Sequence, residues 1–265
     1  GSDRSMSEFR IASFNVNSVR SRLPILRRWL AKQPVDLLCI QETKAVDADF
    51  PLGDFEEMGY HAAFRGEKSY NGVAAVSREA LGDVSFGLGD GELPDGETRV
   101  LRCVCRGVSV VNTYVPQGKD ISLPDYAVKL RFFARLRALF DREYIGKPLV
   151  WTGDLNIAPT DADVTHPENK RNHVCFHEDA QAAYRAVLDR GFVDVFRKHR
   201  PDAGEFSFFD YRVKGALERN IGWRIDHILA SPDVAERSID AFIDRVPRGW
   251  ERPSDHTPVI ASFDL

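Results

Sequence analysis

The sequence predicts an α/β protein in which helices lie outside mixed β-sheets. Strand-like apolar segments at residues 9–16 and 36–42 flank a segment with helical periodicity, which indicates a helical crossover between two strands. Further strand-like segments at 100–105 and 108–115 are joined only by Arg106-Gly107, which predicts a hairpin. Because one chain contains both kinds of connection, its sheets should hold parallel and antiparallel strands.

The other elements are expected in order along the chain. The first helix should span about 22–33, because Leu23, Leu26, Trp29 and Leu30 recur on one helical face. The remaining elements are strands at 60–66, 72–78, 148–153, 225–231, 238–245 and 257–264, and helices at about 125–143 and 178–190, the last ending at Gly191.

Length and composition favour a single domain. The chain has 265 residues, 43% of them hydrophobic, and contains no linker-like or repetitive segment. We expect one domain at 6–265, with residues 1–5 as an expression remnant ahead of Met6. No apolar run approaches a membrane span, so no membrane partner is expected.

The four cysteines are too few and too scattered for a disulfide framework, which indicates the reducing cytoplasm. Cys103 and Cys105 alternate in one expected strand, so both should point to the same buried face.

The net charge of −4 gives no general attraction to nucleic acid. A DNA-binding protein of this charge must gather its cations in a patch, because affinity for phosphates depends on local charge. For each cation the alternative is a solvated loop charge. The candidates are Arg20, Arg22, Arg65, Lys68, Arg212, Lys214, Arg219 and Arg224.

Short polar side chains stand where several expected strands end. Gly153-Asp154-Leu155-Asn156 follows the apolar run at 149–151, and Ser254-Asp255-His256 precedes the run at 259–263. Taken alone, the first is also typical of a structural turn and the second of a helix-capping loop. The pattern recurs at Asn15, Asn17, Glu42, Tyr114, Gln117 and Asp226.

Buried polar groups are costly unless they have partners, so one shared site explains these residues economically. Carboxylates, amides and an imidazole with a pKa near neutrality suit divalent-metal and phosphate chemistry. The sequence therefore predicts a site for phosphate chemistry at the strand ends.

Six motifs occur in order: SFNVN, QETK, NTYVPQG, GDLNIAPTD, GWRID and SDH. In this set the chain resembles the exonuclease III family of AP endonucleases, within the endonuclease/exonuclease/phosphatase superfamily, which also holds the DNase I-like enzymes. The resemblance runs from about Phe9 to Leu265, and NTYVPQG, DYRVKG and GWRID point specifically to its DNA-repair branch.

The resemblance implies a four-layered α/β sandwich of two packed mixed β-sheets flanked by helices. It implies a monomeric Mg²⁺-dependent phosphodiesterase, with Mn²⁺ as a possible substitute. Its expected partner is double-stranded DNA with abasic sites, cut on their 5′ side, or with blocked 3′ ends. Exonuclease activity in the 3′→5′ direction and 3′-end cleaning are expected as well.

For the metal, the expected residues are Glu42, Asn15 and Asp255. Glu42 ends an apolar strand, and the resemblance places the metal on the glutamate of QETK. A salt bridge from Glu42 to Lys44 or to an arginine is the alternative.

For catalysis, Asp154 is expected to activate water, and Asn156 to hold that water or a phosphate oxygen. Asp154 and Asn156 should face one side of an extended segment. His256 is expected to act as base or phosphate ligand, with Asp226 orienting it as an imidazolium and Tyr114 donating to the phosphate.

For substrate binding, the resemblance implies DNA contacts at Asn17, Arg20, Tyr70, Asn71, Gln117 and Arg212. It also implies that Phe208, Trp223 and Ile225 wall a small apolar pocket for a base-less sugar turned out of the duplex. The chain has Phe208-Phe209 where many relatives carry a tryptophan pair or a mixed pair. Core packing is the alternative for these aromatic residues.

Two other classes of function fit parts of the sequence. The same fold could hydrolyse other phosphoesters, such as inositol phosphates or sphingomyelin, or serve as a non-catalytic nucleic-acid-binding regulator. Zinc binding is a weaker alternative, because His173 and His177 have a suitable spacing but no second ligand pair accompanies them. His166 and Cys175 lie in the same polar loop.

Overall fold

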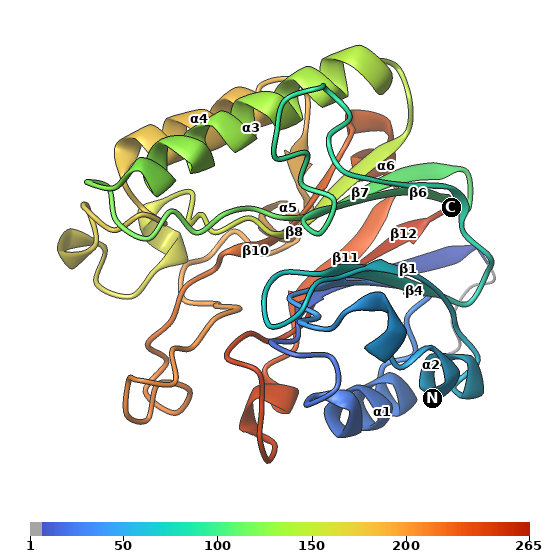
Figure 1. The fold of residues 1–265 in the computed structure, drawn as a ribbon. Helices are drawn as coiled ribbons and strands as arrows, with labels where there is room; N and C mark the ends of the chain where they lie inside the picture. Colours follow the sequence, from blue (N-terminus) through green and yellow to red (C-terminus); the bar gives the residue numbers. More distant parts are fainter. Residues whose placement is uncertain (1–6) are drawn as a thin grey trace.

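The computed structural model describes residues 7–265, so the expected expression remnant at residues 1–5 lies outside it. The described chain forms two six-stranded sheets with helices on their outer faces (Figure 1). None of the helices in the described residues combines the length and the apolar character needed to cross a bilayer.

Each sheet is mixed, with a single parallel pair, β1 with β2 in the first and β7 with β8 in the second. The first sheet has the order β11 (Ser238–Ile243), β12 (Val259–Asp264), β1 (Glu8–Asn15), β2 (Leu37–Gln41), β4 (Val73–Ser77) and β3 (His61–Arg65). The second has the order β5 (Gly82–Phe86), β6 (Val100–Cys105), β7 (Val108–Tyr114), β8 (Leu149–Asp154), β10 (Asp226–Ala230) and β9 (Val193–Asp194).

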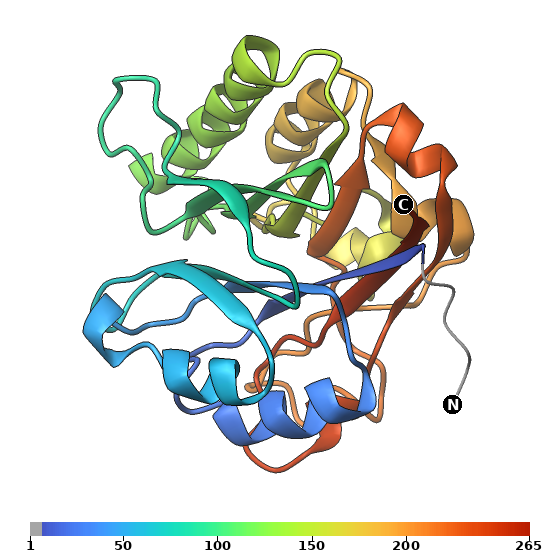
Figure 2. The same ribbon diagram turned by 90° about the vertical axis from the view of Figure 1, so that its right-hand side faces the viewer.

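The two sheets pack face to face, and this gives the predicted four layers (Figure 2). One buried cluster fills the space between the sheets and joins Ile11 of β1 to Ile228 of β10. Cys103 and Cys105 both belong to this cluster, so the expectation that they share a buried face is confirmed. Burial of apolar area in several layers is the main contribution to the stability of such a sandwich.

The helices cover the two outer faces. On one face α1 (Leu23–Lys32) and α2 (Leu52–Glu57) lie against the first sheet, and on the other α3 (Pro124–Glu143) and α4 (Glu178–Leu188) lie against the second (Figure 2). In α1 the apolar spacing buries Leu26, Trp29 and Leu30, as the helical periodicity predicts.

Besides the short 3₁₀ helices, five short elements of the described residues were not predicted: α2, β5, β9, α5 (Val195–His199) and α6 (Pro232–Glu236). Elements of two to six residues are too short to develop a periodic pattern, and the mostly exposed β5 has no apolar alternation to detect.

The expected functional residues meet where β1, β2, β7 and β8 end. Gly153 allows β7 and β8 to approach closely there. Its φ is +142°, and a Cβ on it would lie 1.9 Å from the carbonyl oxygen of Thr113. Only glycine fits this position, which places Asp154 beside the end of β7.

Candidate active site

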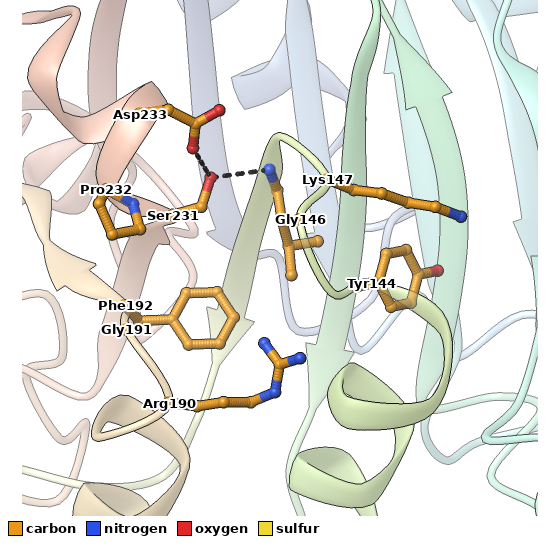
Figure 3. Close-up of a pocket in the computed structure, with 10 residues that line it drawn as sticks. Tyr144, Gly146, Lys147, Arg190, Gly191, Phe192, Ser231, Pro232 and Asp233 are labelled. Atoms are coloured by element: carbon orange, nitrogen blue, oxygen red, sulfur yellow. Dashed lines mark hydrogen bonds between the residues drawn. The ribbon is translucent and has the colours of Figure 1, made fainter.

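Two cavities open at opposite ends of β8. One, of about 440 Å³, lies near the start of the strand at Leu149 (Figure 3). Its polar groups already bond one another, since Ser231 Oγ donates to Asp233 Oδ1 and accepts the Leu149 N–H. The other, of about 330 Å³, lies where β8 ends at Asp154. Acids, amides and an imidazole converge on this second cavity.

Most of the residues expected to act at the strand ends line this cavity. The lining consists of Glu42, Tyr114, Gln117, Asp154, Asn156, His173, Cys175, Phe208, Asp210, Arg212, Trp223, Ile225, Asp255 and His256. They come from both sheets and from loops far apart in the sequence.

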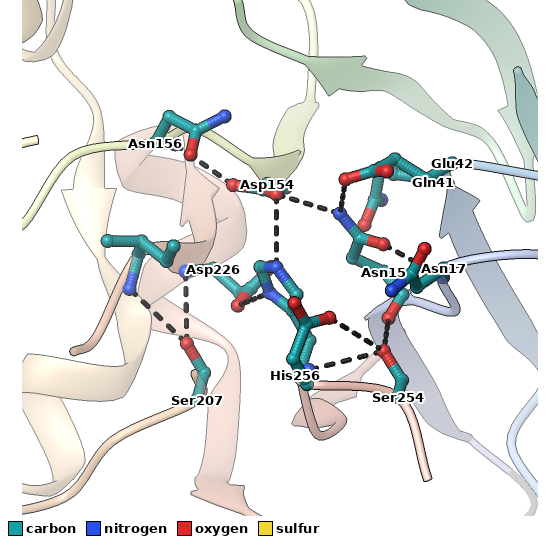
Figure 4. Close-up of polar contacts among 12 residues, drawn as sticks. Asn15, Asn17, Gln41, Glu42, Asp154, Asn156, Ser207, Asp226, Ser254 and His256 are labelled. Carbon is teal, nitrogen blue, oxygen red and sulfur yellow. Dashed lines mark hydrogen bonds and ion pairs between the residues drawn. The ribbon is translucent and has the colours of Figure 1, made fainter. Parts of the chain in front are cut away.

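Asn15, at the end of β1, holds two carboxylates side by side (Figure 4). Its Nδ2 donates to Glu42 Oε1 at 2.8 Å and to Asp154 Oδ2 at 2.9 Å. Its Oδ1 accepts the N–H of Asn17 at 3.0 Å. The buried amide therefore fixes the carboxylates of β2 and β8 relative to each other.

His256 lies between two carboxylates (Figure 4). Its Nδ1 is 2.8 Å from Asp226 Oδ2, and its Nε2 is 3.5 Å from Asp154 Oδ2. Burial opposes a charged imidazole, but the carboxylates of Asp226 and Asp154 outweigh it and raise the pKa of His256 to about 10. The two carboxylates therefore favour the imidazolium form of His256.

The carboxyls of Asp154 and Glu42 have opposite pKa shifts. Burial, with the nearby charges of Asp226 and Glu42, raises the pKa of Asp154 to about 7 despite the opposing effect of His256. Burial also acts on Glu42, but the hydrogen bond from Asn15 and the charge of His256 prevail and lower its pKa. Glu42 thus remains ionised, while Asp154 is basic enough to accept a proton near neutral pH.

Glu42 also forms the salt bridge that the sequence left open as an alternative. Lys44 Nζ lies 3.4 Å from Glu42 Oε2 and donates to Asn17 Oδ1 at 2.6 Å. The bridge engages one carboxylate oxygen, while Asn15 bonds the other. Glu42 still lines the cavity, so the ion pair and a role in the site are compatible.

Asn156 reaches the cavity by a different route from the one expected. Its φ is +48°, so the segment after β8 turns. The expectation that Asp154 and Asn156 belong to one extended segment is therefore wrong. The turn is stabilised because Asn156 N–H donates to Asp154 Oδ1 and its Nδ2 donates to the carbonyl of Val115. Both side chains nevertheless line the same cavity.

Tyr114 ends β7 beside an arginine that sequence reasoning missed. Burial and the nearby carboxylates of Glu42 and Asp154 raise the pKa of Tyr114, so its phenol stays protonated and can donate a hydrogen bond. Arg99 lies with its guanidinium 4.8 Å from the centre of the Tyr114 ring and donates to its carbonyl. Nothing in the sequence around Arg99 marks it as part of the site.

Phe208, Trp223 and Ile225 form an apolar wall of the cavity and also pack on the buried cluster beneath the second sheet's helices. Phe208 and Trp223 pair across an antiparallel bridge, and the Phe208 ring lies 4.9 Å from the ring of His256. The ring of His173 packs 4.5 Å from that of Trp223. The apolar wall thus lies directly beside the charged row of Asp154, His256 and Asp226.

Of the expected DNA contacts, Asn17 bonds Asn15 and Lys44, and the other five separate into two groups. Gln117 and Arg212 line the cavity. Arg20, Tyr70 and Asn71 lie outside its lining: Arg20 pairs with a surface aspartate, Tyr70 is 69% exposed, and Asn71 donates to a glutamate. These three positions are accessible from solvent, as a contact to a large ligand requires.

Arg224 is not available to DNA, and its inclusion among the phosphate-binding candidates is wrong. It is 1% exposed and pairs with Asp163 at 2.7 Å and with Asp194 at 2.8 Å. A buried arginine with two carboxylate partners has a structural role, here linking the Asp163 turn to β9 behind Trp223.

The side chains considered for zinc have other partners. His177 caps α4, accepting the N–H of Asp179, and bonds the hydroxyl of Tyr126. His173 Nδ1 accepts the N–H of Cys175. Of the residues that lie close together in the sequence, His177 therefore caps a helix, while His173 and Cys175 line the cavity.

Lys129, in the second turn of α3, is a second residue that sequence reasoning missed. It is fully buried, and its Nζ donates to the carbonyls of Gln117, Asn156 and Val174. Burial lowers the pKa of Lys129, but three carbonyl acceptors require the three N–H groups of an ammonium ion. Lys129 therefore fastens three loops that bound the cavity.

A buried row of carboxylate, imidazolium and carboxylate, with a further ionised carboxylate beside it, is typical of metal-dependent hydrolases of phosphate esters. The carboxylate oxygens of Asp154 and Asp226 and a ring nitrogen of His256 lie within 4.8 Å of one another. Fold and site together thus define a phosphoesterase of the two-sheet sandwich class.

Comparison with known proteins gives the family. The sequence profile of the endonuclease/exonuclease/phosphatase family matches residues 12–256. Exodeoxyribonuclease III of Haemophilus influenzae is 35% identical, over 95% of this chain and 98% of its own length. An AP endonuclease from Archaeoglobus fulgidus superimposes with a TM-score of 0.94 at 49% identity, covering 97% of this chain and 100% of its own. A 3′–5′ exonuclease from Neisseria meningitidis gives 0.93 at 39%, with the same coverage.

The chain belongs to the endonuclease/exonuclease/phosphatase family. Within it the chain is a nuclease of the exonuclease III and AP endonuclease type, which confirms the resemblance seen in the motifs.

Proposed function

We propose that this protein is a Mg²⁺-dependent DNA-repair nuclease that cuts duplex DNA on the 5′ side of abasic sites. It also removes nucleotides or blocking groups from 3′ ends, and Mn²⁺ can replace Mg²⁺. The observation that carries the proposal is the contact between the Asp154–His256–Asp226 row and an apolar wall beside it. The names of the Archaeoglobus and Neisseria relatives agree with the two activities.

The donor set fits a hard cation. Glu42 and Asp255 supply carboxylate oxygens in the cavity, and Glu42 is held ionised by its surroundings. Asn15 fixes the Glu42 carboxylate, because the amide nitrogen of Asn15 donates a hydrogen bond to it. When bound, the cation would polarise the phosphate and neutralise charge that develops during its displacement.

Asp154 and His256 have different roles in proton transfer. His256 already carries its proton at neutral pH, so Asp154 is the group that accepts a proton from the attacking water. The water oxygen bonds to phosphorus, the bond from phosphorus to the 3′ oxygen breaks, and the leaving 3′ oxygen takes a proton from solvent water to become a hydroxyl. Asn156 orients the water, while Tyr114 and the imidazolium of His256 stabilise the negative charge on the phosphate oxygens.

Selection of the damaged site depends on the apolar wall. A nucleotide without a base is turned out of a duplex at the lowest cost, because pairing and stacking are already lost there. Phe208, Trp223 and Ile225 offer such a sugar an apolar surface next to Asp154 and His256. An intact nucleotide would have to place its base in the same small space.

The test is cleavage of a duplex with one abasic site, with Mg²⁺ and with EDTA. We expect cleavage only with Mg²⁺, and a loss of roughly 10²–10⁴-fold in Asp154→Asn and in His256→Asn with DNA binding retained. Binding without cleavage by the wild type would favour the regulator. Hydrolysis of inositol phosphates or sphingomyelin instead of DNA would favour the other phosphoesterases.

A further inference from the structure

A basic surface lies beside the catalytic cavity, between α1 and the loop that contains η4 (Val246–Gly249). Figure 1 shows this loop next to α1, on the side of the molecule away from α3 and α4. The two segments enclose a cavity of about 420 Å³ whose lining includes Ser21, Arg28, Trp250 and Arg252. We call it the α1–η4 surface.

The cations of this surface are free to bind a ligand. The guanidinium of Arg28 lies 4.0 Å from the centre of the Trp250 ring, and Lys32 Nζ lies 5.5 Å from it. Within residues 7–265, neither Arg28 nor Arg252 has a carboxylate within ion-pair distance or a side-chain hydrogen bond. Neighbouring Arg20 and Arg27, in contrast, are both paired with acids.

Stacking on Trp250 prepares Arg28 for binding. The indole face restricts the guanidinium plane, while the N–H groups at the edge of that plane stay exposed to solvent. An arginine held in this way loses less conformational entropy when it binds a planar or tetrahedral anion. Of the lining residues only Glu251 is acidic, so the surface favours an anionic partner.

Hydrogen bonds link the α1–η4 surface to a turn next to Asn15 of the site. Arg22 joins them: its Nη1 donates to the carbonyl of Arg252 at 2.8 Å, and its Nη2 donates to that of Asn17 at 2.9 Å. Ser21 follows the Asn17 turn, and Arg252 precedes Asp255 in the chain. The α1–η4 surface is therefore fixed relative to the Asn17 turn, which Asn15 bonds at the site.

We propose that the α1–η4 surface binds the phosphodiester backbone of the duplex that flanks the cleavage site. The proposal rests on the proposed function, because it assigns this contact to the same DNA that the catalytic cavity holds. Arg28 and Arg252 each contact a phosphate, and Trp250 orients Arg28. The contacts carry no sequence information, since they reach only the backbone.

The test is a binding experiment with Arg28→Gln/Arg252→Gln and three duplexes, in EDTA so that no cleavage occurs. One duplex just spans the cavity around an abasic site, and the other two are extended by about one helical turn, ~10 base pairs, on one side or the other. Fluorescence anisotropy gives the affinity at several salt concentrations.

We expect the double variant to bind one of the extended duplexes about tenfold more weakly or worse, because hydrogen bonds to charged groups are lost. The slope of log K against log salt should fall by about 2 on that duplex, since each phosphate contact contributes about 0.9. Affinity for the short duplex should not change. The same loss is expected when the extended duplex is undamaged.

The matched control is Arg137→Gln/Arg185→Gln, which changes the net charge equally on α3 and α4, the outer helices of the other sheet. An equal loss in the control, or an equal loss on the short duplex, would overturn the proposal, and so would unchanged binding to both extended duplexes. Wild-type cleavage of the short abasic duplex with Mg²⁺ is measured separately. Its absence would count against the nuclease proposal, while the anisotropy comparison would still decide the role of the α1–η4 surface.

Discussion

At the residue scale, Glu42 illustrates how local sequence and tertiary partners combine. An apolar strand ending in a carboxylate indicates a functional group, because a buried charge needs a partner. The structure supplies two partners, Asn15 and Lys44, that keep the group ionised without removing it from the cavity. A salt bridge and a ligand role are therefore not exclusive alternatives at this position.

We expect Glu42→Gln to raise the Mg²⁺ concentration needed for half-maximal cleavage, because the change removes a charged hard ligand and keeps the shape. Titration of the cleavage rate against Mg²⁺ measures this. A curve that superimposes on that of the wild type would remove Glu42 from the metal site.

Lys129→Met should lower both stability and turnover. Methionine keeps the length of the side chain but leaves the carbonyls of Gln117, Asn156 and Val174 without a donor. An unsatisfied buried polar group costs about 1–3 kcal/mol, so thermal unfolding should shift measurably.

The same variant should cut more slowly even well below its melting temperature, because the Asn156 turn loses an anchor. Lys147→Met, which removes an exposed lysine, is the control for the loss of charge. A destabilised Lys129→Met enzyme with an unchanged rate would show that Lys129 has only a structural role.

At the scale of elements, the site depends on where strands of different sheets end. The last residues of β1 and β8 belong to different sheets, yet Asn15 bonds Asp154 across 139 positions of sequence. The apolar wall has a similar origin, because the bridge between Phe208 and Trp223 places two loop segments against His256. Substrate choice should therefore respond to changes in this wall.

Trp223→Ala should reduce abasic-site cleavage more than removal of a 3′-phosphate. The change takes away contacts to the extruded sugar, by analogy with aromatic stacking on nucleic acid worth about 1–3 kcal/mol, and widens the space for an intact base. The ratio of the two rates on one duplex at fixed salt is the measurement, with melting checked. An unchanged ratio in a folded variant would mean that Trp223 only packs.

At the scale of the whole molecule, a buried ion-pair network contributes to the dependence of stability on pH. Burial raises the pKa values of Asp163 and Asp194, but Arg224 outweighs it and lowers both below their ordinary values. Carboxyls with a lowered folded pKa stabilise the protein above the unfolded pKa of about 3.9. That stability is lost as the pH falls below this value toward the folded pKa values.

Arg224→Met should destabilise the protein by about 3–5 kcal/mol near neutral pH, because it leaves buried carboxylates without their cation. The two pKa values should then rise, so the difference from the wild type should shrink as the pH falls and the carboxyls become neutral. Urea unfolding from pH 7 to pH 4 measures both stabilities. If the difference in free energy of unfolding between wild type and variant stays constant or grows as the pH falls, the Arg224 ion pairs do not set the pKa values of Asp163 and Asp194.

The motifs predicted much of the site, because short polar residues after apolar runs mark strand ends, and strand ends gather where sheets pack. The boundaries of the long elements were also predictable, since α1 and α3 extend over enough residues for a periodic pattern. Arg99 and Lys129 were not predictable, because Arg99 lies in the turn before β6 and Lys129 in a helix, and neither local pattern marks a residue of a site. Their roles follow from partners far away in the chain.

By itself, the sequence determined the α/β class and the positions of the strands along the chain, and it predicted Asp154, Asp226 and His256 as residues of the site. Only the tertiary structure decided the opposite pKa shifts of Asp154 and Glu42, the burial of Arg224 and the exposure of Arg28. Charge, burial and accessibility depend on which groups lie within a few ångströms. Those neighbours come from segments that folding, and not chain order, brings together.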